Sequence, residues 1–467
     1  MITRTLGNIA AMCGGELSAP ELADTMLTGV VTDSRKITPD CLFVPLSGEK
    51  FDGHHYAAAA LNTGAGGTLW QRDKEAAPEG AVIIVEDTLV ALQKLSAAYL
   101  KEVAPKVVAV TGSNGKTTTK DIIMALLEVQ YRVHKTEGNF NNHIGLPLTI
   151  LSMTEDTEIA VLEMGMSSRG EIALLASLAS PDVAVITNVG ESHLLQLGSR
   201  KEIARAKLEI VEGLKPGGLL IYNGDEPLLA EVMQESTFVS PQGMRKFRFG
   251  VNADNDDYPV GMMTHSSGMT FTSHLHSDAA LTLPLPGQHN VINALAALAV
   301  ARHFGVTNQN IELGLSKLKL TGMRIEVIQT TSGLTLLNDA YNASPTSMKA
   351  AIDVLQSMKC SGHKIAVLGD MLELGPEEIQ FHKEIGSYLD PEKTDLVFTF
   401  GPLSVHIATA AEQRFGVDRI FAFTDKAEMT ATLISKCSTK DVVLFKGSRG
   451  MRLEEVLQSL HNYFQQT

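Results

Sequence analysis

The chain has 467 residues, of which 44% are hydrophobic and 20% charged, and its formal net charge at pH 7 is −14. This length exceeds what one hydrophobic core usually supports, so we expect two to four domains. The negative charge makes nucleic acid and anionic membrane surfaces poor partners, although a local basic pocket is compatible with it.

The cysteines and the apolar runs bear on the compartment. Four cysteines stand far apart, without the spacing of a metal site: Cys13, Cys41, Cys360 and Cys437. We expect free thiols in a reducing compartment. The first residues lack the long apolar core of a signal peptide, and no apolar run reaches membrane-spanning length. These features predict a soluble, cytoplasmic protein.

The first hundred residues alternate short apolar runs with helical patterns. Leu42–Val44 and Val82–Val85 predict strands, and Thr88–Lys101 predicts a helix. Pro105 stands just before the next apolar run, and such a proline is typical of a boundary. We therefore expect a small N-terminal α/β domain over residues 1–103.

From about residue 106 the alternation of apolar runs with longer amphipathic stretches is regular. It is typical of a parallel sheet covered by helices. Residues 258–285 change character and predict a small antiparallel patch, and a helix over Asn290–Phe304 follows, with Gly305 as its stop. The expected strands are Ile159–Leu162, Val183–Ile186 and Leu219–Tyr222. We assign residues 104–319 to a central domain with a mostly parallel sheet.

A second doubly wound pattern occupies residues 320–467. Its expected strands are Thr335–Leu337, Ile365–Leu368, Leu396–Phe400, Ile420–Phe423 and Val442–Phe445. The pattern resembles a dinucleotide-binding fold in outline, so we expect a Rossmann-like C-terminal domain. No G-x-G-x-x-G follows its first strand, and a nicotinamide cofactor is therefore not supported. The predicted fold class is α/β with three domains.

The most informative run joins the first strand of the central domain to a helical pattern from Lys120 to Leu127. It reads Gly112-Ser113-Asn114-Gly115-Lys116-Thr117-Thr118. Small residues let backbone N–H groups surround an anion, and a helix N-terminus adds a positive dipole end. Lys116 can reach outer phosphates, and Thr117 can offer its hydroxyl to Mg²⁺. The run predicts a nucleoside-triphosphate cradle, although Val110 stands where the common pattern has its first glycine.

Further polar candidates follow the strands of the same sheet. Ligands of parallel sheets gather at the carboxyl ends of the strands. Glu163 ends one strand and His193 follows another, so both could reach an ion near Thr117; carboxylate is a natural Mg²⁺ ligand and imidazole a less common one. Taken alone, Glu163 also fits a surface or helix-capping carboxylate. Lys207 lies in a helical pattern, where a solvated lysine is the ordinary interpretation.

Several later residues could contact a nucleotide. Asn290 and Asn293 share one helix face, although N-capping explains Asn290 equally well. Arg324 follows an interdomain turn and could swing onto a γ-phosphate; a surface ion pair is the alternative. The run from Asn338 to Pro345 predicts Asx turns and a helix start, or ribose or base binding.

Taken together and in order, these runs resemble the Mur ligases, ATP-dependent amide-forming enzymes of peptidoglycan precursor synthesis. The resemblance covers essentially the whole chain. Residues 32–54 are similar to the UDP-sugar-binding start of two family members. Residues 136–147 and 368–375 resemble the member that adds D-alanyl-D-alanine to UDP-N-acetylmuramoyl-tripeptide. The shared runs are the phosphate loop and residues 162–165, 187–193, 206–207, 289–293, 323–326 and 338–342.

The resemblance implies roles for the matching residues. Catalytic roles fall to Lys116, Glu163, His193 and Lys207, and Thr117, Glu163 and His193 would hold Mg²⁺, as two ions. Lys207 matches a lysine that is carbamylated in related ligases. The ATP contacts would come from Gly112, Ser113, Asn114, Gly115, Lys116, Thr117, Thr118, Asn290, Asn293, Arg324, Asp339 and Tyr341.

The resemblance also implies the substrates. Ser34 and Arg35 would lie at the UDP-sugar, and Ser167 and Arg169 near its peptide arm. D-alanyl-D-alanine would approach from the C-terminal domain, where residues 446–452 are candidates, and a monomer is expected. The third peptide residue, lysine or diaminopimelate, stays open. The alternatives are the ligase that adds one amino acid at the preceding step, folylpolyglutamate synthetase and a non-catalytic ATP-binding module.

Overall fold

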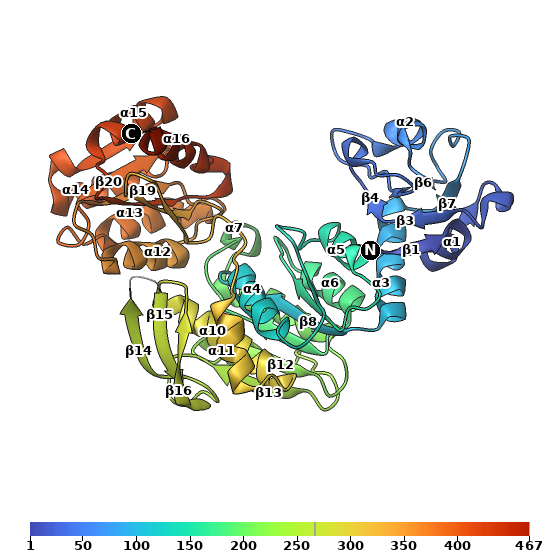
Figure 1. The fold of residues 1–467 in the computed structure, drawn as a ribbon, viewed down its shortest axis with the longest axis horizontal. Coiled ribbons are helices and arrows are strands. Elements are labelled where there is room, and N and C mark those ends of the chain that lie inside the picture. Colours follow the sequence, from blue (N-terminus) through green and yellow to red (C-terminus); the bar gives the residue numbers. More distant parts are fainter. Residues whose placement is uncertain (266–267, 467) are drawn as a thin grey trace.

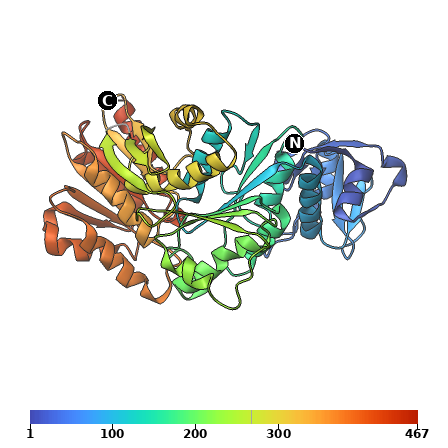
Figure 2. The same ribbon diagram turned by 90° about the horizontal axis from the view of Figure 1, so that it is seen from below.

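The computed structural model describes residues 1–265 and 268–466. Its elements gather into an N-terminal group at one end of the molecule, a central group, and a C-terminal group at the other end (Figure 1). A view turned by 90° shows the same order along the long axis (Figure 2). The expected three-part α/β architecture is confirmed.

The N-terminal group contains a five-stranded sheet in the order β2-β7-β6-β5-β4 and a two-stranded ribbon, β1-β3. Strand β7 is a run of β-branched residues that packs well in a pleated sheet, and most of its side chains are buried. The strands are β1 (Thr3–Thr5), β2 (Glu16–Leu17), β3 (Met26–Thr28), β4 (Val30–Val31), β5 (Leu42–Phe43), β6 (Gly67–Gln71) and β7 (Val82–Val85). The helices are α1 (Leu6–Cys13), α2 (Ala57–Thr63) and α3 (Thr88–Val103).

The central sheet has the order β13-β12-β11-β8-β10-β9, and every pairing in it is parallel. Alternate residues of β8 belong to two different cores: Val107 and Ala109 face one, and Val108 and Val110 the other. Burial on both faces explains the continuous apolar run. The strands are β8 (Lys106–Thr111), β9 (Val133–Lys135), β10 (Ile159–Glu163), β11 (Val183–Ile186), β12 (Leu219–Asn223) and β13 (Arg245–Phe249).

Helices cover both faces of this sheet, and a small antiparallel sheet packs beside it. The sheet β14-β15-β16 confirms the predicted antiparallel patch. Its strands are β14 (Pro259–His265), β15 (Gly268–Ser273) and β16 (His276–Leu283). The helices of the group are α4 (Lys116–Leu127), α5 (Gly145–Ser152), α6 (Glu171–Ala179), α7 (Leu194–Leu197), α8 (Arg200–Leu208), α9 (Pro227–Val232), α10 (Gln288–His303) and α11 (Asn308–Ser316).

The C-terminal group is a second six-stranded sheet, in the order β17-β18-β22-β19-β20-β21. Only β17 pairs antiparallel among the described strands of this sheet. The strands are β17 (Glu326–Gln329), β18 (Thr335–Asp339), β19 (Lys364–Gly369), β20 (Leu396–Phe400), β21 (Ile420–Phe423) and β22 (Val442–Lys446). The helices are α12 (Pro345–Ser357), α13 (Glu378–Tyr388), α14 (Val405–Phe415), α15 (Lys426–Lys436) and α16 (Glu454–Gln466).

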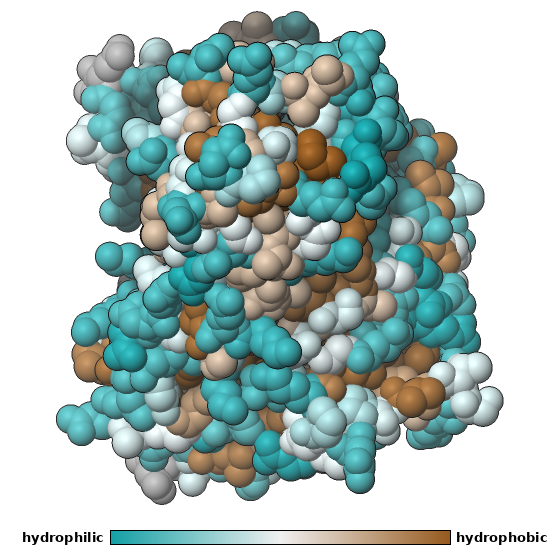
Figure 3. All heavy atoms as spheres, turned by 90° about the vertical axis from the view of Figure 1, so that its right-hand side faces the viewer, coloured by the Kyte–Doolittle hydropathy of each residue, from teal (hydrophilic) through white to brown (hydrophobic). Residues whose placement is uncertain are grey.

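The surface and the thiols add two further observations. Hydrophilic residues dominate the face shown in Figure 3, and the hydrophobic residues there are scattered in small groups. Within residues 1–265 and 268–466, no helix combines the length and the apolar character that crossing a bilayer requires. The four cysteines are free thiols, as predicted.

Candidate active site

A cavity of about 600 Å³ lies between the central and C-terminal groups. Its central side is made by the phosphate loop, the carboxyl ends of β10 and β11, and the start of α10. Its other side is made by residues that follow β18, by the start of α12 and by the end of β22. The carboxyl ends of two parallel sheets therefore face one space, which is where α/β folds bind ligands.

Two glycines allow the phosphate loop to take its shape. Gly112 has φ +150°, and a Cβ there would lie 1.8 Å from Thr187 Oγ1. Gly115 has φ +79°, and a Cβ there would lie 2.4 Å from Asn293 Oδ1. Larger residues would collide at both positions, so the short loop depends on these glycines rather than on one at position 110.

Asn188, which follows β11, clamps the same loop. Asn114 N–H donates to Asn188 Oδ1 at 2.9 Å, and Asn188 Nδ2 donates back to Asn114 O at 3.1 Å. Ser113 N–H donates to the backbone oxygen of Asn188 at 3.0 Å. Sequence reasoning placed Asn188 in a shared run without a role. The structure shows that it fixes the loop conformation.

Lys116 begins α4 and carries a charge with no carboxylate partner among the described residues. Its Nζ donates to Gly112 O at 2.8 Å. Burial lowers the pKa of Lys116, the Arg324 guanidinium lowers it further, and Glu163 opposes the shift. Three nearby polar atoms are buried without a partner: Ser113 Oγ, Asn114 Nδ2 and Arg324 Nε. Unpaired buried polar atoms are costly, so this group of atoms suits an anionic ligand with several oxygens.

Glu163 lies at the end of β10 and is 1% exposed, so the surface-carboxylate interpretation is wrong. Thr117 Oγ1 donates to Glu163 Oε2 at 2.7 Å, and Asn141 Nδ2 donates to Oε1 at 2.9 Å. A hydroxyl beside a carboxylate fits Mg²⁺, which usually takes one or two protein ligands and fills its shell with water and phosphate oxygens. The part of the chain that the structure describes has no metal-binding group of three or more His, Cys, Asp or Glu residues. Asn141 was missed, because an amide in a polar loop carries no distinctive signal.

Lys207, on α8, is 2% exposed, so the solvated-lysine interpretation is wrong. Burial, helped by the charge of Lys116, lowers the pKa of Lys207 well below its ordinary value. The structure describes no hydrogen-bond acceptor or carboxylate at its Nζ. Burial therefore favours the uncharged, nucleophilic form of this amine more than it would in an exposed lysine.

His193 is the N-cap of α7, and its φ of 64° lies in the left-handed region. Its Nδ1 is 2.7 Å from Oε2 of Glu373, although the ring is not aligned for a full hydrogen bond. Burial lowers the pKa of His193, while the nearby Glu373 carboxylate raises it. Glu373 belongs to the C-terminal group, so this pair crosses the cavity.

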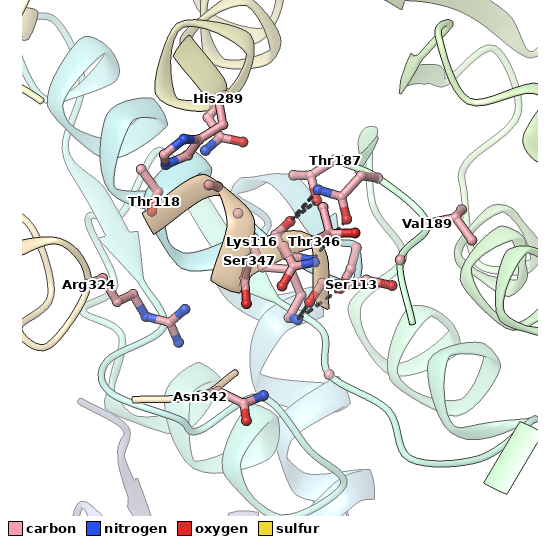
Figure 4. A pocket seen from close by; sticks show the side chains of 18 of the residues that line it. Ser113, Lys116, Thr118, Thr187, Val189, His289, Arg324, Asn342, Thr346 and Ser347 are labelled. Carbon is pink, nitrogen blue, oxygen red and sulfur yellow. Dashed lines mark hydrogen bonds between the residues drawn. The ribbon is translucent and has the colours of Figure 1, made fainter. Parts of the chain in front are cut away.

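Arg324 enters the cavity from the segment that joins the two groups. Its guanidinium carbon is 4.3 Å from the centre of the Tyr341 ring, a cation–π contact. Figure 4 shows the guanidinium directed toward the space beside Lys116. Met323 and Ile325, on either side of Arg324, have φ 62° and 50°. A β-branched residue in this region is strained, so the backbone around Arg324 is set by its surroundings.

The start of α10 and the carboxyl end of β18 complete the lining. Gly287 is the N-cap of α10, so the N-capping interpretation of Asn290 is wrong. Asn290 Nδ2 donates to Pro286 O at 2.8 Å, and Asn293 Nδ2 to Asn290 Oδ1 at 3.3 Å. Asp339 Oδ2 accepts a bond from Lys446 Nζ at 2.6 Å. Ser344 caps α12, as the expected helix start at Pro345 required.

Most of the predicted ATP and catalytic residues therefore line one cavity, and Thr117 lies directly behind it. Ser167 also lines this cavity. Three predicted substrate residues do not. Ser34 and Arg35 lie in the N-terminal group, where Arg35 pairs with Asp33 at 2.8 Å. Arg169 lines a separate cavity of about 330 Å³.

Two side-chain hydrogen bonds join the start of α12 to the central group. Ser344 Oγ donates to Asn114 Oδ1 at 3.2 Å. Thr346 Oγ1 donates to Glu191 Oε2 at 2.8 Å. Thr346 and Ser347 lie near Lys116 in Figure 4. The first turn of α12 is therefore in contact with the loop itself.

Comparison with known proteins places this geometry in a family. Residues 26–104 match the Mur ligase family catalytic domain, 110–301 the Mur ligase middle domain, and 323–449 the Mur ligase glutamate ligase domain. A Bacillus subtilis (strain 168) protein is 51% identical over 461 residues, which cover 98% of this chain and 99% of the relative. The chain is a member of the Mur ligase family. That relative is named UDP-N-acetylmuramoyl-tripeptide–D-alanyl-D-alanine ligase.

Solved structures agree with this membership. A crystal structure of MurF from Acinetobacter baumannii superposes on this Mur ligase with a TM-score of 0.88 at 31% identity, covering 99% of both chains. MurF from Thermotoga maritima, solved in complex with ADP, gives a TM-score of 0.81 at 32% identity and covers 94% of this chain and 98% of that one. The resemblance inferred from the sequence is confirmed.

Proposed function

We propose that this Mur ligase joins D-alanyl-D-alanine to UDP-N-acetylmuramoyl-tripeptide and converts ATP to ADP and phosphate. One observation carries the proposal: a chain that matches UDP-N-acetylmuramoyl-tripeptide–D-alanyl-D-alanine ligases along its whole length holds a lysine without a carboxylate partner at its phosphate loop. The residues that would contact ATP are those named from the sequence, together with Asn188 as the clamp of the loop.

The first step is phosphoryl transfer. A carboxylate oxygen of the tripeptide attacks the γ-phosphorus, the bond to the β-phosphate oxygen breaks, and ADP leaves. Two anions meet in this step, so the charges of Lys116 and Arg324 lower its barrier. Backbone N–H groups of the phosphate loop hold the outer phosphates in place.

The second step forms the amide. The uncharged amine of D-alanyl-D-alanine attacks the acyl-phosphate carbon, the phosphate leaves with the bonding electrons, and the nitrogen loses a proton. Water would hydrolyse the acyl phosphate, so the cavity must be closed while it exists. The bonds from Ser344 and Thr346 to the central group support a role of the C-terminal group in closing it.

Mg²⁺ and a modified lysine belong to the same proposal. Thr117 and Glu163 would hold one ion, and His193 would help with a second. A bound ion supplies charge neutralisation for the phosphate oxygens. Lys207, whose burial lowers the pKa of its amine, would react with carbon dioxide to give a carbamate, whose negative charge suits a position near Lys116 and a metal.

The remaining assignments are also proposals. We divide the chain into domains over residues 1–103, 104–319 and 320–467. Ser34 and Arg35 would contact the UDP-sugar, and Ser167 and Arg169 the peptide arm. A monomeric, cytoplasmic enzyme is consistent with the unpaired thiols and with a substrate that carries a nucleotide.

One assay tests the function: phosphate release from ATP with UDP-N-acetylmuramoyl-tripeptide, with and without D-alanyl-D-alanine. We expect release that depends on the dipeptide. Release that depends instead on a single diamino acid, with the preceding precursor, would indicate the neighbouring ligase. No release with either pair would indicate an ATP-binding module.

A further inference from the structure

The segment from Leu368 to Gly375 joins the end of β19 to a contact with the central group, and the proposed chemistry leaves it without a role. It follows β19 in the C-terminal group and reaches α7 of the central group. Glu373, near its tip, is exposed over half of its side chain. Because the segment lies where the C-terminal group meets the central group, it is a candidate for a role in closing the cavity.

Three bonds from three different elements hold this segment. All three donors are backbone N–H groups, and all three acceptor side chains are buried. They are Ser404 N–H to Asp370 Oδ1 at 2.7 Å, Met371 N–H to His382 Nε2 at 3.0 Å, and Leu372 N–H to Ser448 Oγ at 2.9 Å. The tip of the segment is therefore presented from a rigid base.

The rigid tip contacts α7 in three ways. Glu373 Oε2 is 2.7 Å from His193 Nδ1. Leu195 N–H donates to Glu373 O at 3.1 Å. Gly375 has φ +75°, and a Cβ there would lie 3.3 Å from Leu195 Cα. One residue thus supplies both a side-chain and a backbone contact, and a glycine permits the close approach.

The side-chain contact affects the form of the imidazole. A carboxylate beside Nδ1 attracts the ring proton to that nitrogen, which leaves the Nε2 lone pair free. His193 itself lines the cavity. Because Glu373 comes from the other sheet, the arrangement exists only when the C-terminal group is closed onto the central group.

We infer that residues 370–375 form a closing latch, in which Glu373 is a positioning residue that orients His193 when the two groups meet. The expected effect on turnover rests on the proposed ligase function, whereas the closing contact between residues 370–375 and the central group does not. Closure of the two groups and orientation of His193 then occur together, because Glu373 takes part in both.

The test uses the full chain with Glu373→Gln, which removes the charge and keeps the size. Glu377→Gln is the matched control, because Glu377 is an exposed carboxylate four residues along with no described partner. We expect Glu373→Gln to lower kcat for dipeptide-dependent phosphate release about 10-fold, the range found for residues that orient a site ligand. The KM for ATP should stay within about twofold, since the phosphate loop is unchanged.

A double variant decides whether Glu373 acts through His193. In a His193→Gln background, Glu373→Gln should cause no further loss of kcat. An equal fold-loss in both backgrounds, or no loss in either, would overturn the inference. Thermal midpoints of the single variants should match the unmodified chain, which excludes a general loss of folding.

Small-angle scattering separates this inference from the ligase proposal. The radius of gyration is measured with a non-hydrolysable ATP analogue and UDP-N-acetylmuramoyl-tripeptide. We expect Glu373→Gln to remain more extended than the unmodified chain and Glu377→Gln to match it. If the unmodified chain releases no phosphate, the function fails and this comparison alone judges the latch: equal radii would refute it.

Discussion

Two six-stranded sheets point their carboxyl ends at one cavity, and each brings a lysine to it, yet the two lysines differ. Lys446, at the end of β22, is 2% exposed and lies 2.6 Å from the Asp339 carboxylate. Lys116, after β8, donates only to backbone oxygens. The C-terminal sheet therefore cancels its charge internally, while the central sheet leaves its charge for a ligand.

This difference explains a division of work. An anion gains most where positive charge is desolvated and unpaired. Lys116 and the loop N–H groups supply that environment on the central side. The C-terminal sheet supplies a lysine that is already paired with Asp339, so the side-chain cations left for a nucleotide are Lys116 and, from the joining segment, Arg324.

Removing the unpaired charge should have the largest effect. Lys116→Ala is expected to lower dipeptide-dependent phosphate release about 1000-fold, because the loop loses its only side-chain cation. Lys101→Ala, an exposed lysine on α3, is the control and should behave as the unmodified chain. Near-normal turnover of Lys116→Ala would show that the unpaired charge of Lys116 does not act on the ligand.

Lys207 should have the next largest effect, because it alone among the pocket lysines lacks any described partner. Lys207→Ala is expected to lower turnover about 100-fold. Short carboxylic acids should restore part of it by replacing the carbamate. Lys201→Ala is the control, because Lys201 lies on the same helix, is partly exposed and pairs with Glu235 at 3.0 Å. Intact-mass measurement should find a carbon dioxide-dependent increase on Lys207; full activity of the variant without that increase would reject the carbamate.

Breaking the paired lysine should affect stability more than catalysis. Lys446→Met leaves the Asp339 carboxylate with its buried partner removed, and we expect the free energy of unfolding in urea to fall by about 3 kcal/mol. Adding Asp339→Asn should recover most of that loss. A double variant as unstable as the single one would mean that Lys446 contributes through packing rather than charge.

The smallest effect is expected from His289, which lines the same cavity and is influenced by the charges of Asp339 and Lys446. Burial lowers the pKa of His289 to about 4, while Asp339 raises it and Lys446 lowers it. In the unfolded chain, His289 binds a proton as the pH falls below the ordinary histidine pKa of about 6.5. In the folded chain, it binds that proton only near pH 4. Stability from this group is complete above that ordinary value and is lost as the pH falls.

The thermal midpoint checks this sign. Between pH 7 and pH 5 it should fall less in His289→Gln than in the unmodified chain. His55→Gln, at an exposed position, should follow the unmodified chain. An equal fall in all three would show that His289 is protonated as easily in the folded as in the unfolded state.

The strands in the sheet interiors were predictable, whereas some edge strands were not. Val183–Ile186 is a continuous apolar run and Leu396–Phe400 is apolar apart from Thr399; both strands lie inside their sheets, and their observed bounds equal the predicted ones. Strand β13 reads Arg-Lys-Phe-Arg-Phe and lies at the sheet edge, where its first two residues are exposed and only Phe249 is buried. A charged edge strand has no apolar run to detect.

The same reasoning applies to the site. The phosphate loop was predictable, because its small residues, lysine and following helix are neighbours in the sequence. Asn141 and Asn188 were not, because an amide becomes a clamp only when another strand brings a carboxylate or a loop to it. The burial of Glu163 and Lys207 likewise depends on elements distant in the chain.

By itself, then, the sequence determined the α/β class, the order of the strands along the chain and the chemistry of the loop, because these depend on local periodicity and on adjacent residues. Only the tertiary structure decided which charges are cancelled. Lys446 meets Asp339, 107 residues away, and Glu373 meets His193 across the cavity, whereas Lys116 meets no carboxylate in the described chain. Pairing is a property of distance in space, and sequence spacing does not contain it.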